Sequence, residues 1–470
     1  MLRAALLLAA LAAVAAIGQI HIAYTNLPGV LSVDFVSSDS KVAHAWVSLD
    51  NVTWSCAPAA ATTLFAPTIG YLHQATLNFT GVARGAVAYY KLTTGANAAE
   101  ELGNSSPVFA VVPLVARPEV FAVFGDLGEP GGITDDLTAS AARGDFDAVV
   151  QVGDFAYSLP SENSTVGNNF MTAIQGFAAT HPFMVTEGNH ERCEGCPGIP
   201  GLGADSASNF TECVLRTAAA RARARAHGQN PAPHPQLRPD PYSQPLHNTP
   251  PANRYRARFH SLSLHSNTGQ NRFYSFDRGL AHFVVLTAEA YDAKAGPDFV
   301  ENQLAFLRAD LAAVDRAQTP WVVALAHKNS WMAPEAFADW SPLLQAAKVD
   351  VLFCGHAHQY VRYMPHDPVT NETDAACVSP SGDTYTNPRF MTTIVSGAAG
   401  NREGNNLFNK TGEERPPVFT GSGNVGYGLF TALNETHATW TWKTVKQFKT
   451  EPANYSDALT WVRTAGYLEK

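Results

Sequence analysis

The sequence predicts an α/β chain in two parts, a small all-β sandwich followed by a larger unit in which strands alternate with helices. Three observations predict this fold class. Short β-rich runs separated by turn residues recur up to about residue 115, at the spacing of small sandwiches. After Pro118, near-continuous apolar runs alternate with helix-like stretches, as in sheets that are covered on both faces. Five of these later runs end in Asp, Asn or His.

Residues 1–18 are expected to be a removable secretory signal. Arg3 precedes an apolar run over residues 4–17, and Gly18 supplies a small residue for cleavage. The run is too short for a comfortable membrane span, and no later stretch reaches the roughly 18 consecutive apolar residues that a span needs. We therefore expect a secreted, extracellular protein or one in a lumenal, vacuolar or lysosomal compartment. A buried N-terminal helix is the alternative.

The composition fits such a compartment. Charged residues make up 16 % of the chain, below the roughly 25 % of an average soluble domain. Glycans could supply the missing hydration. Nine Asn-x-Ser/Thr sequons are present, at Asn51, Asn78, Asn104, Asn163, Asn209, Asn371, Asn409, Asn434 and Asn454. A net charge of −9 without a basic block disfavours nucleic-acid binding.

The six cysteines also suit an oxidising compartment. Cys193, Cys196 and Cys213 lie in one loop-like region, where we expect a disulfide whose connectivity stays open. A zinc site there would need a fourth ligand, and the sequence offers no evident one.

The chain divides into two predicted domains. Residues 19–116 are expected to form the sandwich, of fibronectin type III or immunoglobulin type, with a role in packing or recognition. Residues 117–445 form the α/β unit, with an insertion at about 193–251. This insertion is rich in Pro, Ala and Arg, which fits a loop or solvated face better than a binding role. Residues 446–470 are expected to be a C-terminal tail.

The elements of the α/β unit follow in order. A short helix is expected after the first apolar run, with Thr134 as its N-cap. Residues 271–279 and 281–289 look like antiparallel strands, and residues 297–317 have the apolar spacing of an amphipathic helix. The segment 390–442 returns to β structure.

Polar side chains at the five strand ends form the candidate site. The runs end at Asp126, at Asp154 (with Tyr157 beyond it), at Asn189 and His190, at His327, and at His356 and His358. Glycines at most of these ends let the backbone turn sharply. Each motif alone is weak, but the five together supply two carboxylates, a phenol, a carboxamide and four imidazoles. Such a set, at the strand ends where ligands bind, predicts a metal site.

In this order the motifs resemble the dinuclear metallophosphoesterases, and specifically the purple acid phosphatases of the larger two-domain type. The similarity extends to residues 19–26, 254–289, 397–404 and 426–439. The resemblance implies a metallophosphoesterase β-sandwich flanked by helices (α/β/β/α), preceded by a small all-β domain of fibronectin or immunoglobulin type.

The resemblance also implies two metal ions about 3.5–4 Å apart. The first ion would be held by Asp126, Tyr157 and His358 and the second by Asn189, His327 and His356, with Asp154 bridging. The anionic ligands of the first site favour Fe(III), and the neutral ligands of the second suit Zn(II), Mn(II) or Fe(II). A phenolate from Tyr157 on Fe(III) would give the violet colour of the family.

The implied function is a secreted acid phosphatase that hydrolyses small-molecule phosphate monoesters by attack of a metal-activated hydroxide. His190 is the candidate catalytic residue, for transition-state stabilisation or protonation of the leaving group. Asn189 and His190 are expected to contact substrate. A purely structural imidazole at His190 is the alternative.

Other readings of the function remain open. After His327 the run Lys328-Asn-Ser-Trp-Met lacks the substrate-facing histidines of plant-type relatives, so Lys328, Asn329 or Trp331 are candidates to replace them. A phosphodiesterase or nucleotide pyrophosphatase on the same fold is one alternative, and a catalytically inactive binding protein is another. A homodimer is one expected state of assembly.

Overall fold

The computed structural model describes most of the chain. Its main described ranges are 17–38, 43–58, 61–66, 70–95, 104–128, 132–157, 161–191, 268–291, 297–405, 423–446 and 456–464, with short pieces at 159, 255, 258–259, 261–262, 266, 418–421 and 466–468. The predicted insertion, the expected disulfide at Cys193, Cys196 and Cys213, and nearly all of the expected signal lie outside these residues. Among the described helices, none is long and apolar enough to span a membrane.

The first part of the chain forms two four-stranded sheets. One sheet has the order β1 (Ile17–Tyr24), β2 (Val30–Ser37), β6 (Gly70–Asn78) and β5 (Ala61–Ala66). The other has the order β4 (Ser55–Pro58), β3 (Ala43–Ser48), β7 (Ala88–Thr94) and β8 (Phe109–Val111). Neighbouring strands are antiparallel, and the two sheets share one buried core. The predicted all-β first part is confirmed.

Two seven-stranded sheets follow. The first sheet has the order β11 (Phe183–Thr186), β10 (Ala148–Val152), β9 (Val120–Phe124), β20 (Val425–Ala432), β21 (His437–Lys446), β22 (Ser456–Val462) and β17 (Thr384–Thr386). The second has the order β12 (Tyr274–Arg278), β13 (Ala281–Val285), β14 (Trp321–Leu325), β15 (Val351–Cys354), β18 (Thr392–Ser396), β16 (Tyr360–Arg362) and β19 (Phe419–Thr420).

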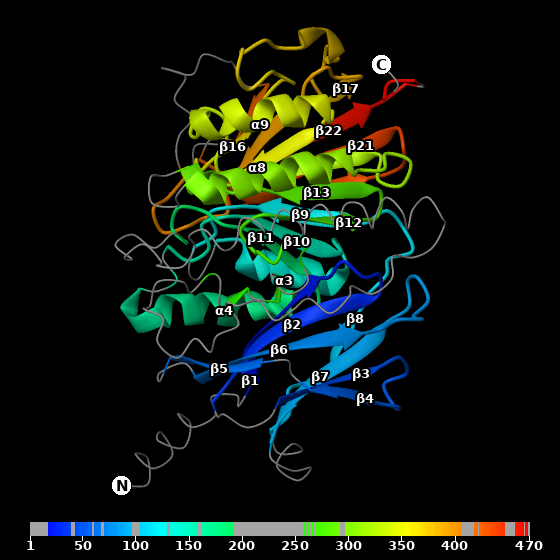
Figure 1. Cartoon of the computed structure of the whole chain (residues 1–470), viewed down its shortest axis with the longest axis vertical. Coiled ribbons are helices and arrows are strands. Elements are labelled where there is room, and N and C mark those ends of the chain that lie inside the picture. Colours follow the sequence, from blue (N-terminus) through cyan, green and yellow to red (C-terminus); the bar gives the residue numbers. More distant parts are fainter. Residues whose placement is uncertain are drawn as a thin grey trace.

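The two large sheets pack face to face, with helices on the outside (Figure 1). Aromatic side chains fill the space between the sheets, since the rings of Phe121 and Phe283 lie 4.7 Å apart and those of Phe353 and Trp440 lie 4.8 Å apart. The helices α3 (Thr134–Arg143) and α4 (Thr165–Ala178) cover the first sheet, and α8 (Pro297–Ala312) and α9 (Pro334–Ala346) cover the second. This confirms the predicted α/β/β/α layering.

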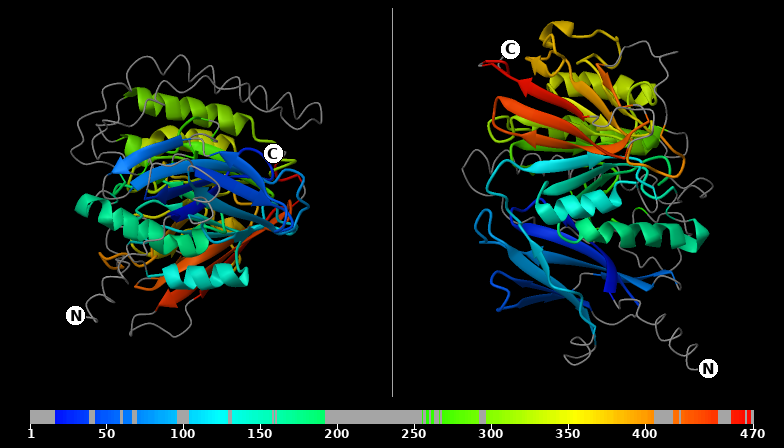
Figure 2. Two further views of the ribbon diagram at one scale, coloured as in Figure 1. Left: turned by 90° about the horizontal axis from the view of Figure 1, so that it is seen from below. Right: turned by 180° about the vertical axis from the view of Figure 1, so that it is seen from behind.

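The sandwich is fixed to the α/β unit on the side of α4 (Figure 2). The Tyr90 hydroxyl donates to the carbonyl of Ala179 at 2.6 Å, and the Tyr24 hydroxyl donates to Glu119 at 3.1 Å. Arg278 pairs with the same Glu119 at 2.7 Å. These contacts join β1 and β7 to the start of β9 and the end of α4. The sandwich therefore packs against the α/β unit close to β9, the strand that leads to Asp126.

Parallel strands bring the predicted motifs to common edges. β9, β10 and β11 are parallel neighbours in the first sheet, and β13, β14, β15 and β18 are parallel neighbours in the second. The carboxyl ends of neighbouring parallel strands lie at the same edge of a sheet, so the polar residues that follow these strands are brought close together. The expected antiparallel pairing of β12 with β13 is also present.

Two details of the sequence interpretation are wrong. Thr134 is the first residue of α3 rather than its N-cap, because the fully buried Ile133 takes the N-cap position where the chain leaves the core. The predicted tail contains β22, which pairs with β21 in the first sheet, so the boundary at residue 445 is too early. Alternating burial of Leu459 and Trp461 is the strand signal that was missed.

A buried histidine joins β12, β13 and α8 and predicts a pH-dependent stability. His282 lies 2.6 Å from Asp277 and 2.8 Å from Asp310. Burial opposes its charged form, but the two carboxylates outweigh burial and raise its pKa from 6.5 to about 9. The stabilisation is therefore complete below pH 6.5 and is lost as the pH rises through about 9, with an upper limit of about 3 kcal/mol.

We expect His282→Asn to be less stable than wild type in urea at pH 6, and the difference to shrink at pH 10. His437→Asn, at the half-exposed start of β21, is the matched control and should be close to wild type in stability at pH 6. A difference for His282→Asn that stays constant from pH 6 to pH 10 would contradict this assignment.

Candidate metal centre

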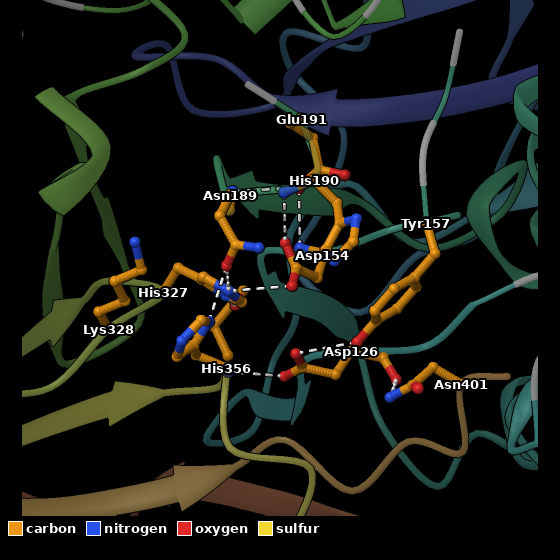
Figure 3. A network of polar contacts seen from close by, with 12 residues as sticks. Asp126, Asp154, Tyr157, Asn189, His190, Glu191, His327, Lys328, His356 and Asn401 are labelled. Carbon is orange, nitrogen blue, oxygen red and sulfur yellow. Dashed lines mark hydrogen bonds and ion pairs between the residues drawn. The ribbon is translucent and has the colours of Figure 1, made fainter. Parts of the chain in front are cut away.

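The structure brings the predicted metal ligands together at the ends of strands from both large sheets. β9 and β10 lead to Asp126 and Asp154, and β11 leads to Asn189. β14 leads to His327, and the turn after β15 carries His356 and His358. Figure 3 shows that side chains from these turns point toward one another. The second sheet therefore completes a site that the first sheet begins.

Asp126, Tyr157 and His358 form the first group of donor atoms. The Tyr157 hydroxyl lies 3.1 Å from Asp126 Oδ1 and 2.8 Å from His358 Nε2. The same histidine nitrogen lies 3.6 Å from Asp126 Oδ1. One phenol oxygen, one carboxylate oxygen and one imidazole nitrogen thus converge on a single point.

Asn189, His327 and His356 form the second group. Asn189 Oδ1 lies 3.1 Å from His327 Nε2 and 2.7 Å from His356 Nδ1. Asp154 Oδ2 lies 3.2 Å from His327 Nε2. Ligand atoms of Asp154, His327 and His356 all lie within 4.8 Å of one another, a spacing that suits a metal ion. Asp154 belongs to this cluster.

The backbone at the site is held in an uncommon conformation. Asp126, Asp154, Tyr157 and His356 have φ angles of 62°, 50°, 49° and 68°, in the left-handed region. Each such residue costs on the order of 1–3 kcal/mol and persists only where surrounding contacts enforce it. Four of the seven candidate ligands are therefore held in this conformation by the surrounding contacts.

Glycines beside these residues leave room for the donor atoms. A Cβ on Gly188 would collide with Asp154 Oδ1, and a Cβ on Gly355 would collide with Asp126 Oδ2. A Cβ on Gly153 would collide with the imidazole of His327. The glycines of the sequence motifs therefore serve close approach as much as turning.

The donor set fits cations. The residues Asp126, Asp154 and Tyr157 are all at most 1 % exposed. Burial is the main cause that raises the pKa of Asp126 and that of Tyr157 well above their ordinary values. Burial lowers the pKa of His356 to about 4, so its imidazole is in the neutral form that binds metals. A bound cation would stabilise the anionic forms of these buried oxygens beside the neutral imidazole of His356.

Glu191 supports the site in a way that the sequence did not indicate. Its buried carboxylate accepts the backbone N–H groups of Asp154 at 2.8 Å, Phe155 at 2.9 Å and Gly188 at 3.0 Å. It therefore ties the turn after β10 to the turn after β11. In the sequence, the only indication of this role was that Glu191 follows the Gly-Asn-His motif. Its hydrogen bonds to the backbone could not be predicted, because they depend on how the chain folds.

The loop after β18 supports the first group of donors. Asn401 Nδ2 donates to the carbonyl of Asp126 at 3.1 Å, and the Arg402 guanidinium donates to the carbonyl of Tyr157. Gly404 presents its carbonyl oxygen 3.1 Å from His358 Nδ1. The stretch 397–404 carried the family resemblance, but these contacts gave no signal in the sequence.

His190 lies over the first group of donors. Its ring centroid is 4.4 Å from that of Tyr157, and its Nε2 is 3.9 Å from Glu403 Oε1. Its backbone N–H donates to Asp154 Oδ1 at 2.9 Å. The side chain is 28 % exposed, so it is accessible at the rim of the site.

The run after His327 is held by a buried acid. Lys328 Nζ lies 2.8 Å from Glu289 Oε1, and Glu289 is in the 3-10 turn that follows β13. Asn329 is buried, and its Oδ1 accepts the backbone N–H of Trp331 at 3.2 Å. Lys328 is therefore positioned beside the second group by a residue that the sequence analysis did not select.

Comparison with known proteins agrees with this site. The Calcineurin-like phosphoesterase family matches residues 120–360, and the family described as iron/zinc purple acid phosphatase-like protein C matches residues 390–450. Purple acid phosphatase 18 of Arabidopsis thaliana is 26 % identical over 351 residues, which cover 72 % of this chain and 63 % of that protein. Acid phosphatase type 7 of Mus musculus is 27 % identical over 343 residues, which cover 67 % and 62 %.

A solved purple acid phosphatase from yellow lupin (Lupinus luteus) seeds has the same fold. The TM-score is 0.68 at 18 % identity, and the match covers 97 % of this chain and 76 % of that one. The chain thus belongs to the calcineurin-like phosphoesterase family, whose model spans the sheets and the turns that carry the candidate ligands. Within that family it groups with the purple acid phosphatases. Membership implies a dinuclear metal centre, and the matches span less than two thirds of the two curated relatives.

Proposed function

We propose that the protein is a secreted acid phosphatase that hydrolyses small-molecule phosphate monoesters at a dinuclear Fe(III)–divalent metal centre. The observation that supports the proposal most is the convergence of seven donor side chains from five strand ends, with a buried phenol among them. A phenol in the donor set favours a hard trivalent ion.

The donors divide between two ions. Asp126, Tyr157 and His358 would hold Fe(III), and Asn189, His327 and His356 would hold Zn(II), Mn(II) or Fe(II), with Asp154 shared. When bound, the two cations would offset the charge of a phosphate group and lower the pKa of water at the site. The protein supplies the geometry, because Glu191 and the loop 397–404 hold the turns in place.

Protein side chains at the rim would bind and orient the ester. His190 is placed to donate a hydrogen bond to a phosphate oxygen, or to give a proton to the leaving alkoxide when the ester P–O bond breaks. The Asn189 amide would contact the phosphate from the other side. Lys328, fixed by Glu289, would add a positive charge where plant-type relatives have histidine.

Secretion and glycosylation are part of the proposal. The sequon residues Asn51, Asn78, Asn371 and Asn434 are exposed, and Asn104 is partly exposed. Asn78 is the last residue of β6 and the other four lie outside strands and helices, and a glycan can be attached at such surface positions. The predicted disulfide in the insertion is compatible with the same compartment.

Purified protein tests the chemistry. We expect about one iron and one further metal per chain, a violet absorption band, and hydrolysis of 4-nitrophenyl phosphate at acid pH. Tyr157→Phe should lose the violet band, while Tyr89→Phe in the sandwich should keep it. A colourless protein that contains only zinc or manganese would overturn the iron assignment. Hydrolysis of diesters alone, or of no ester, would favour a phosphodiesterase or a binding protein instead.

A further inference from the structure

A cavity of about 470 Å³ lies beside the chain segments that follow His327 and His358. Asn329 and Gln359 contribute to its wall, and they follow His327 by two residues and His358 by one. Consecutive Cα atoms are about 3.8 Å apart, so these wall residues lie within about 7.6 Å and 3.8 Å of the two histidines, Cα to Cα. Two of the segments that carry candidate ligands therefore continue into the walls of the cavity.

The walls are uncharged. Trp331, Met332, Tyr363, Pro368 and Val369 are among the lining residues, and the others are Asn329, Ser330, Pro334, Gln359, Asn371 and Val395. A phosphate group has no cation to bind there, whereas an uncharged organic group finds apolar walls with a few amide and hydroxyl groups. A volume of about 470 Å³ lies within the range of small-molecule sites.

Aromatic rings form a fixed part of the cavity. The Trp331 ring lies 4.6 Å from that of Tyr363 and 5.4 Å from that of His366, and Tyr363 is buried. Asn329 holds the turn before Trp331, since its carbonyl accepts the backbone N–H groups of Met332 at 3.1 Å and Ala333 at 3.0 Å. Trp331 is thus presented on a hydrogen-bonded turn that begins beside the metal centre.

We propose that this cavity binds the alcohol portion of the substrate and that this portion is a planar aromatic group, an inference that rests on the proposed phosphomonoesterase function. With the phosphate at the metal centre, the ester oxygen directs the leaving group toward the neighbouring walls. A flat ring gains contact area on Trp331, whose ring is backed by the buried Tyr363, that a short alkyl chain does not. Preference between esters then comes from the cavity, because the phosphate is common to all of them.

The test compares esters that differ in the alcohol alone. We expect the ratio of kcat/KM for 2-naphthyl phosphate to that for ethyl phosphate to fall about tenfold in Trp331→Ala. The control Trp54→Ala, a partly exposed tryptophan in the sandwich, should leave the ratio unchanged. Every variant is also made with Asn371→Gln, because Asn371 begins a sequon and lines the same cavity.

A second variant and a binding measurement keep the test decisive. Met332 is 36 % exposed, so Met332→Ala should fold, and we expect it to lower the same ratio about threefold. Calorimetry with 2-naphthol, which carries no phosphate, should show binding to wild type and at least about tenfold weaker binding to Met332→Ala combined with Trp331→Phe.

The outcomes separate this inference from the proposed function. Binding of 2-naphthol without hydrolysis of any ester would support the cavity and overturn the phosphatase. Hydrolysis of both esters with a ratio that neither Trp331→Ala nor Met332→Ala changes would overturn the cavity and leave the phosphatase standing.

Discussion

Replacing Asp154 by Asn is expected to lower kcat/KM for 4-nitrophenyl phosphate at least about 10³-fold and to reduce the bound metal. Asp154 lies beside the second donor group, with Oδ2 at 3.2 Å from His327 Nε2 and Oδ1 accepting the His190 N–H at 2.9 Å. Burial raises the pKa of this carboxyl, but the charge of His327 and its hydrogen bond outweigh burial and lower the pKa to about 2. The carboxylate is therefore the anionic form that a shared ligand needs.

The amide of Asn keeps the size of the side chain and removes its charge, so the loss would report on charge and ligation rather than on packing. Metal content by elemental analysis and steady-state rates with added iron and zinc measure it. Asp135→Asn, on the exposed face of α3, is the matched control and should keep full activity and full metal. An Asp154→Asn protein with both metals and wild-type turnover would mean that the chemistry resides elsewhere.

The sequence predicted much of the site because the site is built on strand ends. Asp126, Asp154 and His327 each follow an apolar strand within two residues, so local pattern alone placed them at a sheet edge. The local sequence pattern could not predict that these strands divide between two sheets. The meeting of β9 and β10 with β14 and β15 across the core depends on aromatic packing far apart in the chain.

Residues that position other groups of the site were not predictable from the sequence. One helix and one strand separate Glu289 from Lys328 in the chain, so in the sequence Glu289 resembles an ordinary acidic turn residue. Its contact with Lys328 forms only because β13 and β14 pair. The side chains of Asn401 and Arg402 donate to the backbone carbonyl groups of Asp126 and Tyr157. Every residue has such a carbonyl group, so the sequence does not show which of them accept a side-chain hydrogen bond. The strand β22 was missed for a related reason, because its short alternation has meaning only beside β21.

Glu191→Gln is the second change with a large expected effect, about 10–100-fold in metal affinity. The two carboxylate oxygens of Glu191 accept three backbone N–H groups, from Asp154, Phe155 and Gly188. A glutamine has one oxygen, so in either orientation its NH₂ faces a buried N–H and at least one donor loses its partner. Such a loss costs about 1–3 kcal/mol in a buried site.

The cost would fall on the turn that aims Asp154. Asp154 has a φ of 50°, a conformation that relaxes when its restraints weaken. We therefore expect the variant to unfold at lower urea concentration and, separately, to bind zinc more weakly in a competition with a chelator. Glu335→Gln, on the exposed side of α9, controls for loss of a charge. A variant that is less stable yet binds zinc as tightly as wild type would show that Glu191 supports the fold without positioning the carboxylate of Asp154.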